Sequence, residues 1–123
     1  MLQLEEMRLT LSARKSELLD LAEAINYKGL GEQVAELEMK AAEPGFWDDL
    51  DNSQQVLTRT KQLKNRIEEY DALMARFEDA ITLIEIAQEE KDESVLQEIE
   101  ALSDLFFTKL DEMKLSTLLT GDY

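Results

Sequence analysis

The 123-residue chain contains no cysteine and no histidine. Without cysteine, disulfides, thiol nucleophiles and thiolate metal sites are excluded. Without histidine, the most frequent general base and the most frequent metal ligand are also missing. We therefore expect a protein that is not an enzyme and that holds no cofactor and no metal.

Proline and glycine are scarce as well, with one proline and four glycines in the whole chain. So few turn-forming residues argue against a β fold with many turns and favour long helices. Hydrophobic residues make up 44% of the chain, which is enough for a core and is not a disordered composition. The length fits a single helical domain over residues 1–123.

Basic residues are outnumbered, with 13 lysines and arginines against 28 acids and a net charge of −15. A field of this sign repels phosphate backbones, so we expect no direct binding to nucleic acid. The one basic cluster consists of Arg59, Lys61, Lys64 and Arg66. It is either a solvated helix face or a partner contact, and the solvated face is the simpler interpretation.

Long apolar runs are also absent. No stretch approaches the roughly 18 apolar residues that a membrane helix needs, so we expect no membrane association. The first six residues already carry two acids, which is unlike the basic start of a secretory signal. These features predict a cytoplasmic protein.

The apolar residues that are present recur at helical spacing in the N-terminal third. The pattern predicts a helix over Leu2–Ile25, interrupted only by Arg14, whose long stem can carry its charge to solvent or bury it. Residues 26–29 should end this helix, with Gly29 in the left-handed conformation. A short second helix is predicted over Leu30–Glu43.

The third segment has the clearest pattern, with steps of three and four residues held over four heptads. A helix over Ser53–Gln88 would be roughly 50 Å long, too long for a compact globule. A last helix should follow a capping box at Ser94 and Gln97. The heptad positions of the third helix are Val56, Thr60, Leu63, Ile67, Tyr70, Met74, Phe77, Ile81 and Ile84. The predicted fold is all-α, an elongated antiparallel bundle with coiled-coil-like packing, three long helices and one short.

Two aromatic residues, Phe46 and Trp47, follow the Pro44-Gly45 turn between the second and third helices. Their rings either plug the end of the bundle or stay exposed as an anchor for a partner. The acids that follow resemble part of a calcium loop, but its glycine and final glutamate are missing at the required offsets, so they are interpreted as helix caps.

Several stretches together resemble the bacterial peptide chain release factor 2 family, over essentially the whole chain and in the family's order. The turn EPGFWDD at 43–49 and the ending LLTGDY at 118–123 are the most specific. Leu50 departs from the proline that relatives commonly have there. The remaining stretches are LQLEEMR at 2–8, KSELLDL at 15–21 and AELE at 35–38.

The resemblance implies the N-terminal domain of a class I translation termination factor. Members of the family recognise the stop codons UAA and UGA with a Ser-Pro-Phe tripeptide and release the peptide with a Gly-Gly-Gln loop. This chain contains neither motif, so no catalytic or decoding residue carries over. The family's first domain contacts the stalk base of the large ribosomal subunit and lies near release factor 3, which are the expected partners.

The heptads alone fit a second hypothesis, a free-standing coiled-coil adaptor or oligomerisation module. An adaptor would use its first apolar seam between chains, whereas the termination-factor domain would bury that seam within one chain. We expect a monomer or a weak homodimer. The possible partner contacts are Phe46, Trp47, Arg59, Lys61, Lys64 and Arg66.

Overall fold

A computed structural model describes residues 1–120 of the chain, and the predicted tail at 121–123 lies outside them. Every regular element in this part is helical, which confirms the all-α prediction. A single 3-10 turn, η1, joins the third and fourth helices. The elements are α1 (Leu2–Ala13), α2 (Lys15–Ala24), α3 (Tyr27–Ala41), η1 (Phe46–Asp48), α4 (Leu50–Glu90) and α5 (Leu96–Thr120).

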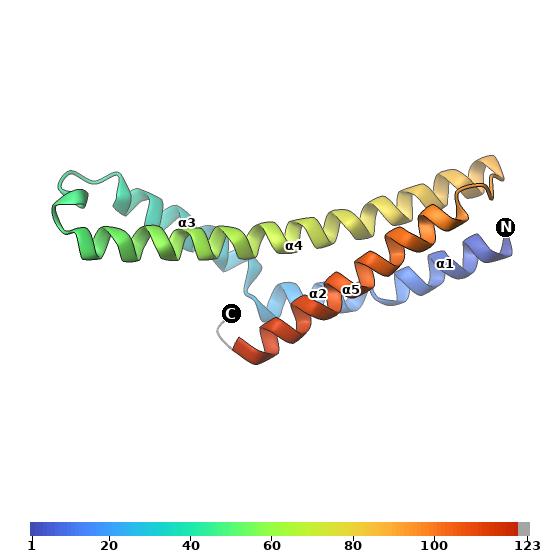
Figure 1. Cartoon of the computed structure of the whole chain (residues 1–123), viewed down its shortest axis with the longest axis horizontal. Coiled ribbons are helices and arrows are strands. Elements are labelled where there is room, and N and C mark those ends of the chain that lie inside the picture. The colour runs from blue at the N-terminus through green and yellow to red at the C-terminus, as the bar shows by residue number, and fades with distance from the viewer. Residues whose placement is uncertain (121–123) are drawn as a thin grey trace.

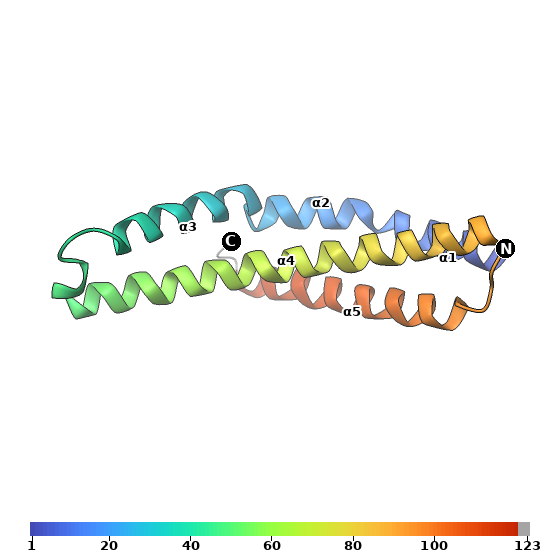
Figure 2. The ribbon, with the colours of Figure 1, turned by 90° about the horizontal axis from the view of Figure 1, so that it is seen from above.

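The 41-residue helix α4 is the spine of an elongated bundle and spans about 60 Å at 1.5 Å per residue. Helices α1, α2 and α3 form one row antiparallel to it (Figures 1 and 2). Helix α5 turns back at the far end and covers only the C-terminal half of α4. The molecule therefore has two parts, a body and an arm. The body consists of the α1–α2 row, the remainder of α4 and α5, and the arm consists of α3, η1 and residues 50–65 of α4.

The α1–α3 row breaks at two places. The sequence pattern did not predict the first break and placed the second one three residues too late. The predicted first helix is divided at Arg14, which separates α1 from α2. The second break lies at Asn26, which has a left-handed φ of 54°, and not at Gly29. Asparagine tolerates this conformation better than other residues with a side chain, because its short amide bonds locally. Helix α3 consequently begins at Tyr27, earlier than predicted.

Gly29 contributes to the second bend in a different way. It lies within the first turn of α3, where a Cβ atom would stand 2.1 Å from Nδ2 of Asn26. The missing side chain therefore leaves room for the Asn26 amide beside the helix. The prediction that Gly29 ends the first helix in the left-handed conformation is therefore wrong, because Asn26 takes that conformation and Gly29 lies inside α3.

Of the predicted heptad positions of α4, every second one is buried as expected, whereas other residues take the place of the positions between them. Leu63, Tyr70, Phe77 and Ile84 are buried as expected. The intervening buried positions are Arg66, Leu73, Ala80 and Ala87, whereas Ile67, Met74 and Ile81 are half-buried at the flank. This follows because α4 packs against both the α1–α3 row and α5, so its buried stripe is wider than a two-helix seam.

The apolar seam of the first predicted helix is buried within the chain. Leu4, Leu11 and Leu18 are fully buried and belong to the same core cluster as residues of α4 and α5. On α5, the ring of Phe106 is also fully buried and lies 5.4 Å from the ring of Phe77. These contacts hold the body together through side chains from all of its helices.

The start of α4 is capped earlier than predicted. The carboxylate of Asp49 accepts a hydrogen bond from the main-chain N–H of Asn52 at 3.1 Å, so the helix begins at Leu50. Ser53, where the helix was predicted to begin, is fully buried, and its hydroxyl donates to the carbonyl oxygen of Phe46 at 2.5 Å. Both contacts fasten the aromatic turn to α4.

Candidate partner-contact surface

The aromatic turn at the tip of the arm divides the roles of its two rings. Phe46 is 7% exposed and plugs the end of the arm, whereas Trp47 is 62% exposed. The rings meet edge to face with centroids 5.2 Å apart, so the buried ring supports the exposed one. The sequence left open whether these rings plug the end of the bundle or stay exposed. Phe46 is the buried plug, and Trp47 is the exposed ring.

Further apolar side chains are exposed elsewhere on the arm. Leu50 is 63% exposed, Met39 is 72% exposed and Leu57 is 41% exposed. The sequence pattern gave no role to Met39 and Leu57, although both stand outside the predicted buried faces of their helices. That off-face placement is the signal that could have identified them. Together with Trp47, they are the large apolar side chains that are exposed on the arm.

The predicted basic cluster separates into exposed and buried members. Arg59, Lys61 and Lys64 are exposed on α4, and Lys64 pairs with Glu38 of α3 at 2.9 Å. Arg66 does not join them, because its side chain is 5% exposed and its guanidinium lies 3.9 Å from Glu69. Arg66 occupies a core position of α4, so the exposed part of the predicted cluster consists of the other three residues.

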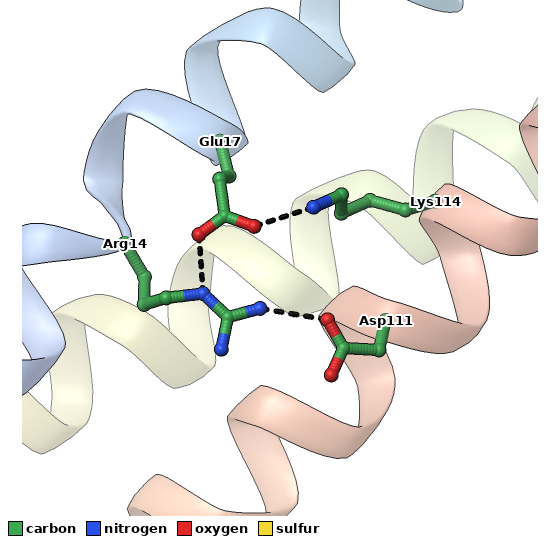
Figure 3. Close-up of polar contacts among 4 residues, drawn as sticks. All are labelled: Arg14, Glu17, Asp111 and Lys114. Atoms are coloured by element: carbon green, nitrogen blue, oxygen red, sulfur yellow. Dashed lines mark hydrogen bonds and ion pairs between the residues drawn. The ribbon is translucent and has the colours of Figure 1, made fainter.

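The junction of the α1–α2 row with α5 carries the densest set of ion pairs (Figure 3). Arg14, at the break between α1 and α2, pairs with Glu17 and with Asp111 of α5, at 2.7 Å for the second contact. Lys114 of α5 also donates to Glu17. The Lys114 hydrogen bond, followed by Arg14, lowers the pKa of Glu17 against the opposing effect of burial. The Arg14 side chain is 27% exposed and ion-paired, so its charge is neither fully buried nor carried to open solvent.

The described residues offer no arrangement for metal chemistry. Nowhere in residues 1–120 do three or more acidic side chains come together in a group that could hold a metal ion. In the same part of the chain, no helix is long and apolar enough to cross a membrane. The exposed features described above are the Trp47 ring at the aromatic turn and three basic residues of α4, on a chain with a net charge of −15.

Comparison with known proteins identifies the class. The PCRF domain family matches residues 30–123, which include most of α3 and all of η1, α4 and α5, and the chain belongs to this family. No solved structure matches the chain.

The relatives then specify the protein to which the chain is similar. Peptide chain release factor 2 of Clostridium perfringens (strain SM101 / Type A) is 31% identical over 99% of this chain and 33% of its own length. Release factor 2 of Corynebacterium glutamicum (strain R) is 32% identical over 96% of this chain and 32% of its own length. Release factor 2 of Beutenbergia cavernae is 34% identical over 92% of this chain and 30% of its own length. The predicted resemblance is confirmed, and the chain spans about a third of these relatives.

Proposed function

We propose that this chain acts in translation termination as a non-catalytic domain that positions a release factor on the ribosome. The observation that carries the proposal is the similarity to release factor 2 over 99% of the chain and a third of the relative. The relatives' names describe release of a peptide chain, and a ribosome is where this takes place. The proposed setting is therefore the cytoplasm, and the proposed unit is one helical domain over residues 1–123.

The shape and charge of the chain support a positioning role. The helical arm extends away from the body (Figure 1). The exposed ring of Trp47 at the turn of the arm is therefore available to a partner at a distance from the body. The net charge of −15 favours encounter with basic proteins, and ribosomal proteins are commonly basic. We propose the stalk base of the large subunit as the main contact and release factor 3 as a second one.

The adaptor hypothesis receives less support from the fold. An adaptor would leave the seam of its first helix open for another chain, yet Leu4 and Leu11 are fully buried in the core of this chain. The same observation supports a monomer or a weak homodimer. Sedimentation equilibrium measures this directly, and an obligate dimer would favour the adaptor.

Co-sedimentation of the 123-residue chain with bacterial ribosomes at low ionic strength tests the proposed function. We expect saturable binding that weakens when Trp47→Ala or Lys61→Glu changes the exposed surface of the arm. The matched controls are Leu119→Ala and Lys15→Glu, which alter an exposed apolar and an exposed basic residue of the body. No saturable binding by the unchanged chain, or equal losses in test and control variants, would overturn the proposal.

A further inference from the structure

A groove of about 350 Å³ runs between α1 and α5, the outer helices of the body. Its size lies in the range of sites that hold a small ligand or a single side chain. Its lining residues are spaced by three and four along each helix, as expected for two facing helices. They are Gln3, Glu6, Met7 and Thr10 of α1 and Leu96, Glu100, Ser103, Asp104 and Phe107 of α5.

The groove is lined by acids from both sides and by no base. Glu6 comes from α1, and Glu100 and Asp104 come from α5. The apolar side chains of Met7 and Phe107 line the same groove and are half-buried. Carboxylates above an apolar floor suit a ligand that has a cationic head and an apolar stem.

Ser103 is the observation that distinguishes this groove from an ordinary acidic surface. Its side chain is 7% exposed, and its hydroxyl has no hydrogen-bond partner among the residues that the structure describes. A buried polar group without a partner is uncommon in folded proteins and costs free energy. A donor brought into the groove by a ligand would supply the missing partner.

Phe107, one of the residues that line the groove, already contacts a guanidinium of this chain. The guanidinium carbon of Arg14 lies 5.2 Å from the centroid of the Phe107 ring, within cation–π range. The charge of Arg14 is balanced by Glu17 and Asp111, so the free carboxylates of the groove are not neutralised by it. The three acids that line the groove, Glu6, Glu100 and Asp104, therefore remain available to a second cation.

We propose that the α1–α5 groove binds an arginine side chain presented by a basic segment of a protein partner. A guanidinium offers five donors in a planar fork, enough to reach Glu6, Asp104 and the Ser103 hydroxyl together. A lysine ammonium offers a compact point charge with fewer directed donors, so it fits two facing helices less well. The stem of the arginine lies on the apolar floor.

This proposal does not rest on a role in termination. The groove is in the body, whereas the ribosome test addresses Trp47 and Lys61 on the arm. Loss of binding in one test therefore leaves the other result interpretable.

Titration of the ¹⁵N-labelled 123-residue chain with a hexa-arginine peptide, followed by NMR, tests the groove. We expect saturable shifts of amides in α1 and α5, and roughly tenfold weaker binding after Glu100→Gln/Asp104→Asn, from the loss of charge-assisted hydrogen bonds. The control Glu89→Gln/Glu90→Gln removes the same charge at exposed positions of α4 and should bind almost as the unchanged chain does. Equal weakening by both pairs would overturn the proposal.

Two further comparisons separate arginine from charge in general. Hexalysine and spermidine should bind more weakly than hexa-arginine, and equal affinity would overturn the guanidinium assignment. Ser103→Ala leaves the net charge unchanged and should weaken hexa-arginine binding several-fold while the folded chain becomes no less stable. If that variant binds hexa-arginine as the unchanged chain does, Ser103 is a packing residue only and the proposal fails.

Discussion

The hydroxyl of Tyr70 in α4 donates a hydrogen bond to the main-chain carbonyl of Leu18 in α2, at 2.9 Å and shielded from solvent. The Tyr70 ring also lies 4.9 Å from the ring of Tyr27, the first residue of α3. One side chain of the spine thus contacts the helices on both sides of the bend at Asn26. Because the bend has no side-chain cap of its own, Tyr70 is well placed to fix the angle between α2 and α3.

Tyr70→Phe should lower the free energy of unfolding by about 1 kcal/mol, the usual net value of a buried hydrogen bond. Urea denaturation followed by circular dichroism measures the change. The control is Tyr27→Phe, which removes an exposed hydrogen bond to Asp71 and should cost less. Equal effects of the two variants would show that burial does not strengthen the Tyr70 contact.

The extent of α4 and its antiparallel pairing with α5 could be predicted because large apolar residues repeat there every three or four positions. The burial of Arg66 and Ala80 could not be predicted from that pattern. Alanine adds little to a hydrophobic stripe and arginine subtracts from it, yet both occupy core positions where α4 meets two neighbours. A pattern of large residues shows one seam and cannot show how many helices will cover it.

The two bends and the tip show a second limit of sequence reasoning. The apolar pattern is interrupted at Arg14, but its helical spacing continues on both sides, so the pattern does not predict that the helix breaks there and lets this residue reach α5. Phe46 and Trp47 are neighbours of similar character, and composition cannot decide which ring is buried. That choice depends on the main-chain path fixed by the Asp49 cap and the buried Ser53. The exposed surface of the arm follows from those contacts.

The ion pairs around Glu17 should couple α2 to α5 in a salt-dependent way. A double-mutant cycle of Glu17→Gln and Lys114→Met should give a coupling of about 0.5–1 kcal/mol in low salt, the range for partly exposed pairs. The coupling should shrink in 1 M salt because the Debye length falls to about 3 Å. Urea denaturation of the four proteins at both salt concentrations measures it.

The pH dependence of this pairing has a definite sign. The folded-state pKa of Glu17 lies below the ordinary value of 4.5, first because of the Lys114 hydrogen bond. Its contribution to stability is therefore complete above that value and disappears as the pH falls through the folded-state pKa. In Glu17→Gln this part of the acid destabilisation should be absent, and an unchanged pH profile would contradict the role of the pair.

Glu5 should remain ionised to unusually low pH. Hydrogen bonds from Arg8 first, and then from Gln88 of α4, lower its pKa from 4.5 to about 2. NMR titration of the side-chain carboxyl carbon should show the low midpoint, and Gln88→Ala should move it part of the way back. A midpoint of Glu5 that does not respond to Gln88→Ala would exclude the contact with α4.

The glycines of α3 should respond differently to alanine. A Cβ atom at Gly31 meets nothing within 4 Å, so Gly31→Ala should raise the free energy of unfolding by about 0.5–1 kcal/mol through helix propensity. At Gly29 the added Cβ would collide with the Asn26 amide, so part of that gain should be lost as the amide turns away. Thermal unfolding of the two variants compares them, and a larger gain at Gly29 would contradict the packing at the bend.

The neighbouring rings at the tip of the arm give the last prediction. Phe46→Ala should cost about 3 kcal/mol, the low end for a buried phenylalanine, because Phe46 is buried at the tip and lies outside the main core cluster. Trp47→Ala should cost at most about 1 kcal/mol, since it loses an edge-to-face contact and little buried area. Urea denaturation of both variants measures the difference. A costly Trp47→Ala would mean that this ring is part of the fold, and it would then be unsuitable as a probe of partner binding.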